Sequence, residues 1–145
     1  MSLAIRELTA RDRYSLATLM RSVAGKTVDD RSPVALAFLT DPATFVFGAY
    51  HDDAPVGWAW GNVQRRPDGR IATYLHEIEV VPSARRAEVT SMLVRAVLAR
   101  ARRAGHHQVW LVTGADDGVA NALYESLGSV RVGRGEVVHR WRIDG

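Results

Sequence analysis

The stretch IATYLHEIEVVPSARRAEVTSMLVRAVLARARRAGHHQVWLVT, residues 71–113, decides the fold of this chain. Its first part, residues 71–81, is rich in β-branched and aromatic residues and stops at Pro82, as a strand does. In residues 85–104 apolar side chains recur at three- and four-residue spacing, which predicts a helix. Residues 108–113 form an apolar run that predicts a buried strand. A strand, a helix and a second strand in this order predict one parallel crossover.

The flanking segments extend this unit to a whole domain. On the N-terminal side they predict a strand at 4–8, a helix capped by Thr9 and running to Val23, and a helix opened by Ser32-Pro33 and ending at 39. Two strands follow, at 44–51 and 56–63. On the C-terminal side they predict a helix at 117–127 and strands at 129–132 and 137–143 around the turn Gly133-Arg134-Gly135. The order is β-α-α-β-β-β-α-β-α-β-β. Because tight turns join most consecutive strands, the sheet is expected to be mixed and mostly antiparallel, with about seven strands. This indicates an α/β fold of the α+β type, with residues 1–145 as a single domain.

Cysteine is absent from the 145 residues, which excludes disulfides, thiolate zinc sites, iron–sulfur clusters and a cysteine nucleophile. This composition fits a reducing compartment, so we expect a cytoplasmic protein. The N-terminus lacks the apolar run of a signal peptide, and no stretch approaches the ~20 apolar residues of a membrane span. No metal-ligand spacing is present, so neither a metal nor a membrane is expected as a partner.

Arginine dominates the basic residues. There are 19 Lys+Arg against 16 Asp+Glu, and Lys26 is the one lysine. Arg85 and Arg86 stand where the long helix begins, and a helix N-terminus offers free N–H groups and partial positive charge to a phosphate. The pattern indicates either a phosphate site or a solvated helix end. The arginines farther along this helix lack aromatic neighbours and a DNA-binding motif, which favours a solvated face over a nucleic-acid site.

The segment from Tyr74 to Gly128 resembles the core of the GNAT superfamily of acyl-CoA-dependent N-acetyltransferases. The resemblance rests on the strand Ile78-Glu79-Val80-Val81-Pro82, on Arg85 in the first place of the following loop, and on Ala120, Leu123-Tyr124 and Gly128 in a later helix. Within the superfamily, residues 74–80 and 116–128 are most similar to the aminoglycoside 3-N-acetyltransferase group. The resemblance implies helices on both faces of the sheet and a homodimer.

The resemblance also implies where acetyl-CoA would bind as cosubstrate. In that family the diphosphate lies on the backbone N–H groups of the loop and first helical turn, and the pantetheine arm pairs with the strand end near Val80. The positions that match here are Arg85, Arg86, Ala87, Glu88, Val89 and Thr90.

Two positions of this loop depart from the family pattern, because Glu88 and Thr90 stand where the family has glycine or a small residue. A threonine hydroxyl can donate to phosphate, whereas a carboxylate about 6 Å from a phosphate charge costs about 0.7 kcal/mol even in water. If the Glu88 side chain points to solvent, binding of acetyl-CoA is weakened only modestly. If it lies over the loop, it blocks binding.

Glu77 and Glu79 are two residues apart on a strand and therefore share one face. They could bind a cationic amine and remove its proton, or they could pair with arginine on a neighbouring strand. By resemblance Glu77 occupies the acidic position, and the sequence leaves open which of the two is the base. His76 is expected on the opposite face, and Trp58 and Trp60 on one face of their strand, in the core or lining a cleft.

Tyr124 could simply pack in the core with its hydroxyl satisfied. By resemblance it is the general acid that protonates the CoA thiolate. Asp117 is expected to cap its helix, and by resemblance it and Asn121 are secondary candidates for cofactor contact.

These patterns together predict an N-acetyltransferase that moves acetyl directly from acetyl-CoA to a small amine. The acidic residues favour a cationic acceptor such as an aminoglycoside, a polyamine or a peptide amine. The main alternative is a degenerate GNAT domain that binds or regulates without transferring acetyl, and a basic nucleic-acid-binding protein is a second.

Overall fold

The computed structural model describes residues 2–29, 31–82, 84–132 and 136–144. Its elements follow the expected order: β1 (Leu3–Glu7), α1 (Arg13–Ser22), α2 (Pro33–Thr40), β2 (Thr44–His51), β3 (Ala54–Arg65), β4 (Ile71–Val80), α3 (Arg86–Arg103), β5 (Gln108–Gly114), α4 (Gly118–Ser126), β6 (Val130–Val132) and β7 (Glu136–Arg142). The expected turn Gly133-Arg134-Gly135 lies outside the described residues.

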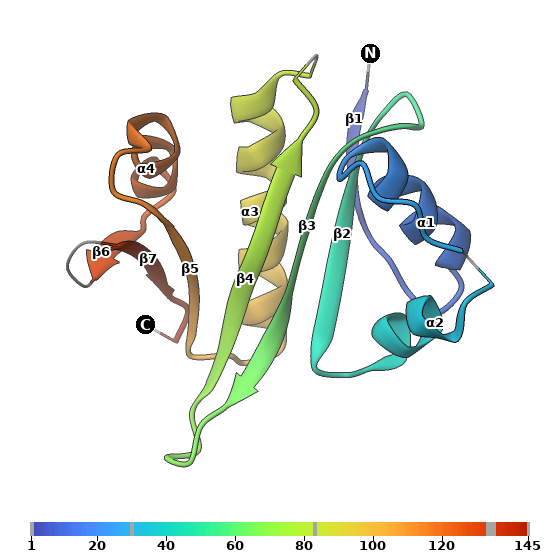
Figure 1. Ribbon diagram of the computed structural model, residues 1–145. Helices are drawn as coiled ribbons and strands as arrows, with labels where there is room; N and C mark the ends of the chain where they lie inside the picture. Colours follow the sequence, from blue (N-terminus) through green and yellow to red (C-terminus); the bar gives the residue numbers. More distant parts are fainter. Residues whose placement is uncertain (1, 30, 83, 133–135, 145) are drawn as a thin grey trace.

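The seven strands form one sheet in the order β1-β2-β3-β4-β5-β7-β6. Every neighbouring pair is antiparallel except β4 and β5, which are parallel because α3 connects them. The mixed, mostly antiparallel sheet and the single crossover are therefore confirmed. Figure 1 shows α1 and α2 beside β2 and β3, and α3 crossing behind β4.

Two apolar clusters hold the helices on opposite faces of the sheet. The larger one packs the buried side of α3, including Leu93 and Val97, against β2 to β5 and against α4. The smaller one packs α1 and α2 against Val46 and Trp58. Burial of these apolar faces, rather than helix propensity, stabilises the short α1 and α2.

The cap of α1 differs from the prediction. The N-cap residue is Asp12, and Thr9 instead precedes a turn, because its N–H and hydroxyl both donate to the Asp12 carboxylate at 2.7 and 3.1 Å. Ser32 does cap α2, accepting a hydrogen bond from the Val34 N–H at 3.2 Å.

A β-bulge interrupts the pairing of β3 with β4. Trp60 pairs with Glu77, but the next residue, Gly61, pairs with Leu75, so that His76 is an extra residue on β4. A Cβ atom on Gly61 would lie 1.9 Å from the Tyr74 carbonyl oxygen, so only glycine fits here. The bulge changes which side chains share a face, with consequences for the site.

Candidate active site

A cleft of about 850 Å³ opens between the end of β4, the start of α3 and α4. It brings together seven residues that the sequence predicted as catalytic or cofactor-binding, namely Glu79, Val80, Arg86, Ala87, Thr90, Asp117 and Tyr124. The remaining wall comes from apolar side chains of the loop after α1, the end of β4 and α4. The cleft thus gathers parts of the chain that lie up to a hundred residues apart in sequence.

The end of β4 offers unpaired backbone groups to this cleft. Within the described residues, β4 pairs with β5 only from Ala72 to Tyr74. On its other side, the Val81 N–H donates to the Val56 carbonyl at 2.9 Å. Because backbone groups of successive residues point to opposite sides of a strand, the N–H and C=O of Val80 face away from β3, toward the cleft. They can pair with an amide of an extended ligand.

The first turn of α3 supplies the N–H groups of Arg86, Ala87 and Glu88, which have no carbonyl partner inside the helix. The Val89 N–H is already used, because it donates to the Arg85 carbonyl at 3.0 Å. The phosphate-binding N–H groups expected from Arg86 through Thr90 are therefore reduced to the first three helical residues. Three such groups at the positive end of a helix dipole still form an anion site.

The side chains of this turn divide between two directions. Arg86 and Thr90 line the cleft. Arg85 and Glu88 line a separate hollow near β1 and form an exposed ion pair with 3.2 Å between Nη1 and Oε2. Val89 is 2% exposed and belongs to the core. Glu88 therefore does not cover the cleft, and the Arg85 side chain, which was expected at the cofactor site, lies outside it.

Tyr124 lies at the inner wall of the cleft on α4. Its ring is 8% exposed and makes edge contacts with the rings of His139 and Trp141, with centroids 4.9 and 6.1 Å apart. Burial, and secondly the charge of Asp117, raise the pKa of Tyr124 above 10.0. Its hydroxyl therefore keeps its proton at neutral pH and can act as a donor. Asp117 caps α4 as expected, accepting from the Ala120 N–H at 3.1 Å.

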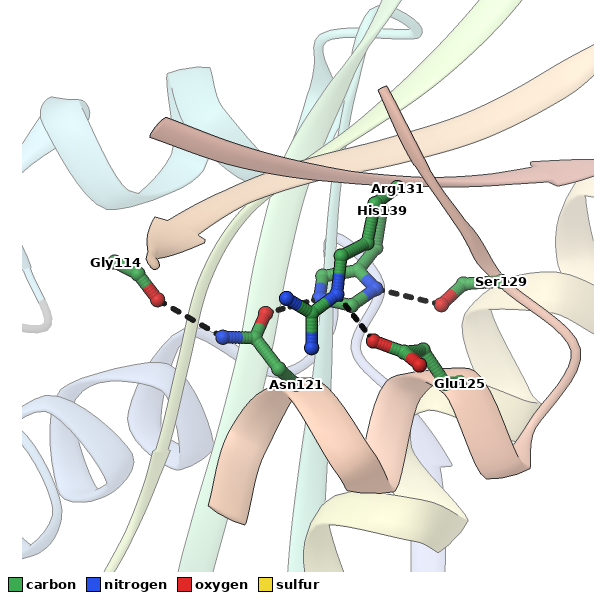
Figure 2. A network of polar contacts seen from close by, with 6 residues as sticks. All are labelled: Gly114, Asn121, Glu125, Ser129, Arg131 and His139. Carbon is green, nitrogen blue, oxygen red and sulfur yellow. Dashed lines mark hydrogen bonds and ion pairs between the residues drawn. The ribbon is translucent and has the colours of Figure 1, made fainter. Parts of the chain in front are cut away.

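A buried polar network holds α4 in place, as Figure 2 shows. The Asn121 side chain donates to the Gly114 carbonyl at 3.0 Å, so its oxygen is the acceptor for His139 Nε2. His139 Nδ1 lies 2.6 Å from the Ser129 hydroxyl. Burial lowers the pKa of His139 below 6.5, so the ring is neutral, with its proton on Nε2 and the hydroxyl donating to Nδ1. The network links α4 to β5 and β7 directly behind Tyr124.

This network corrects one expectation. Asn121 was a candidate for cofactor contact, but it is 0% exposed and both ends of its amide are engaged in the network. Its part in the site is to position α4. Figure 2 also shows the exposed ion pair of Arg131 with Glu125, which joins the same helix to β6.

The two strand carboxylates lie beside the two tryptophans of β3. Trp60 Nε1 donates to Glu77 Oε2 at 2.7 Å, and Trp58 is opposite Glu79. Trp58 Nε1 and Glu79 Oε2 are buried and have no hydrogen-bond partner among the described residues. Burial first, and then the neighbouring Glu77, raise the pKa of Glu79 above 4.5. A carboxylate with a raised pKa and a free oxygen is suited to accept a proton.

The β-bulge decides this arrangement. The expectation that His76 faces away from the carboxylates is wrong, because its ring stacks on Trp60 at 4.5 Å with 10° between the planes. In a regular strand of the same sequence, Glu77 would share the face of Leu75, which is 2% exposed in the larger core cluster. The bulge instead places Glu77 on the Trp60 side.

A second, smaller pocket of about 290 Å³ adjoins the cleft at Ala24. Trp58 and Trp60 were expected in the core or lining a cleft, whereas the apolar side chains from α1, the loop after it and α2 were not predicted as part of a site. The lining consists of Leu16, Met20, Ala24, Lys26, Val28, Val34, Ala35, Phe38, Trp58, Trp60 and Glu77. Glu77 thus belongs to this pocket, whereas Glu79 belongs to the cleft.

No group of three or more histidine and carboxylate side chains close enough to hold a metal ion occurs within the described ranges. Over the same part of the chain, none of the helices combines the length and hydropathy that crossing a bilayer requires.

Comparison with solved structures finds the same fold in several acetyltransferases. An aminoglycoside acetyltransferase from an uncultured soil metagenomic sample superposes with a TM-score of 0.80 at 19% identity, over 92% of this chain and 94% of that one. NAA60 of Arabidopsis thaliana, in complex with a bisubstrate analogue, gives 0.73 at 14% identity over 99% of both chains. The paiA N-acetyltransferase of Thermoplasma acidophilum, in complex with coenzyme A, gives 0.70 at 14% identity over 98% and 99%. At these identities the likeness shows a shared fold.

No curated protein matches the sequence. The family model described as acetyltransferase (GNAT) family matches residues 5–129, which is most of the chain. The protein therefore belongs to the GNAT acetyltransferase family, whose members use acetyl-CoA.

Proposed function

We propose that the protein is an N-acetyltransferase that moves acetyl directly from acetyl-CoA to a small cationic amine. One observation carries the proposal: a single cleft gathers the free backbone of Val80, the N-terminus of α3, the Tyr124 hydroxyl and Glu79. These are, in the same order, a strand end that can pair with an amide, an anion site, a proton donor and a proton acceptor. Family membership supports acetyl-CoA as the donor.

The cleft fits acetyl-CoA by its donor chemistry. The N–H groups of Arg86, Ala87 and Glu88, together with the Arg86 guanidinium and the Thr90 hydroxyl, suit a diphosphate. The Val80 carbonyl suits the N–H of an amide in the pantetheine arm. Acetyl-CoA supplies an acetyl thioester next to this strand end. The Val80 N–H is then placed to stabilise negative charge on the thioester carbonyl oxygen.

Glu79 is the better-placed base of the two carboxylates. An alkylamine with a pKa near ~10 arrives as the ammonium and must lose a proton before it attacks. Glu79 lines the cleft, has a free buried oxygen and has a raised pKa. Glu77, held by Trp60 in the adjoining pocket, is placed to attract the ammonium.

Tyr124 is the proposed general acid. Its hydroxyl stays protonated at neutral pH, it lines the cleft, and the network behind it fixes its helix. It can therefore deliver a proton to the departing thiolate. Because the chain has no cysteine, a cysteine acyl-enzyme is excluded, which favours direct transfer.

Titration with acetyl-CoA tests the donor half of the proposal. Calorimetry is expected to give saturable binding, because Glu88, the residue that motivated the non-enzymatic alternative, lies outside the lining of the cleft. Absence of binding at millimolar acetyl-CoA would overturn the proposal.

Release of the CoA thiol in the presence of a panel of primary amines tests the transfer half. The chain contributes no thiol to the signal, so the background is that of the reagents alone. Tight binding with no transfer to any amine would favour the binding module instead. A homodimer and a cytoplasmic location stay predictions.

A further inference from the structure

The pocket beside the cleft is lined mostly by apolar side chains, which is unusual for a site that binds a polycation. Among its described lining residues, Glu77 and Lys26 alone carry a charge. The rest are aliphatic or aromatic, and even the rim is apolar, since Val34 is 71% exposed. A polar, many-hydroxyl ligand buried here would lose water without gaining hydrogen bonds in return.

The aromatic walls are fixed rather than adaptable. The Phe38 ring meets Trp60 edge-on, with centroids 6.0 Å apart, and His76 stacks on the Trp60 indole at 4.5 Å. The Trp60 N–H is tied to Glu77, so its ring cannot turn without breaking that hydrogen bond. Rigid aromatic faces favour a flat apolar group that makes offset or edge contacts with them.

Size and position agree with such a group. A cavity of about 150 Å³ accommodates benzene, so the roughly 290 Å³ here has room for one or two fused rings. Glu77 is part of the pocket lining, and Glu79 of the adjoining cleft lies two residues farther along the same strand. A ring in the pocket would thus leave an amine on a short chain at the two carboxylates.

We propose that the acceptor is a primary amine with a compact aromatic body, an arylalkylamine, rather than an aminoglycoside or a polyamine. The inference rests on the proposed acetyl transfer for its catalytic meaning. Binding of the ring to the pocket does not depend on transfer.

Two measurements test the pocket with defined amines. In the transfer assay, kcat/KM for 2-phenylethylamine and tryptamine is expected to exceed that for propylamine by about 30-fold, because burial of an aromatic ring contributes on that scale. Spermidine and sisomicin are expected to be poorer than propylamine. In the absence of acetyl-CoA, the two aryl amines are expected to perturb tryptophan fluorescence, because Trp58 and Trp60 line the pocket.

A matched pair of variants tests the location. Val28→Asp puts a carboxylate into the apolar wall and is expected to weaken binding of 2-phenylethylamine at least 10-fold. Thr27→Asp adds the same charge one residue away, at an exposed position outside the pocket lining, and is expected to change it less than twofold. Equal effects of both variants would overturn the inference, since charge alone would then explain them.

The outcomes separate the two proposals. One outcome is that aryl amines bind, as measured by fluorescence, that Val28→Asp abolishes this binding, and that no amine is acetylated. It would support the assignment of the pocket and overturn the proposed acetyl transfer. Efficient transfer to spermidine or sisomicin, with no measurable binding of aryl amines, would support the transferase and overturn the pocket assignment.

Discussion

The cleft and the adjoining pocket are lined by different kinds of chemical group. The cleft presents backbone groups of Val80 and of the α3 N-terminus, with a few polar side chains, and nearly all of its wall comes from residues 78–90 and 117–124. The neighbouring pocket presents apolar side chains from four separate segments. The difference fits the proposed division of roles, in which backbone groups of the cleft hold acetyl-CoA and side chains of the pocket select the amine.

The largest effect is expected when the carboxylate of Glu79 in the cleft is neutralised. Glu79→Gln is expected to lower kcat about 1000-fold, because a positioned base contributes two to four orders of magnitude. Glu77→Gln, the matched change in the pocket, is expected to raise KM for the amine and to lower kcat far less. Steady-state kinetics on both variants is the measurement. A larger loss of kcat in Glu77→Gln would make Glu77 the base and Glu79 the residue that attracts the ammonium.

The pH profile of kcat/KM tests whether Glu79 is the titrating base. A base acts when deprotonated, so kcat/KM is expected to rise as pH increases through the raised pKa of Glu79, above 4.5. Glu77 is one cause of that raised pKa. The rising limb in Glu77→Gln is therefore expected to move to lower pH, and a limb that stays in place would show that Glu79 is not the titrating group.

Tyr124→Phe removes the donor that distinguishes the cleft from the pocket. We expect kcat to fall about 100-fold, while the Kd for acetyl-CoA changes less than twofold, because the ring and its packing remain. Calorimetry and turnover on the same preparation provide the check. Unchanged turnover would remove the assigned role.

Asn121→Ala tests whether the cleft depends on its buried support. The substitution leaves the His139 N–H without a partner in the interior, which is expected to lower the free energy of unfolding by about 2 kcal/mol. Ala122→Ser, at an exposed position on the same helix, is expected to be neutral. Urea unfolding of both variants tests this, and equal stability would mean that the network carries little of the packing of α4.

The smallest expected effect concerns the two adjacent arginines. Arg86→Ala is expected to raise the Kd for acetyl-CoA about 10-fold, because it removes a cation that lines the cleft. Arg85→Ala is expected to raise it less than twofold, because that side chain pairs with Glu88 on the far side. Similar losses in the two variants would show that both side chains reach the diphosphate.

Sequence patterns predicted the element order and the parallel crossover, because the order depends on local periodicity and the crossover on the length of the connection. Strand ends were correct to within two residues, and the caps Ser32 and Asp117 were correct because each acts on its own helix. Thr9 failed as a cap because the helix begins only at Arg13, with Asp12 as its N-cap residue. His76 failed because a bulge shifts the face of every residue before it, although Gly61 within a strand was a signal that could have revealed it.

The segments that resemble the GNAT core could be predicted from the residues alone. Glu79, Val80, Arg86 and Tyr124 lie in them, and the geometry of each is set within a single strand, turn or helix. Tertiary structure alone decided where Glu88 points, which carboxylate lies in which cavity, and that Asn121 supports rather than binds. It alone assembled the apolar pocket, because Met20, Val28, Phe38 and Trp60 lie on four segments whose approach depends on packing across the whole sheet. Local interactions are encoded in neighbouring residues, whereas the apolar pocket forms only after distant segments pack together.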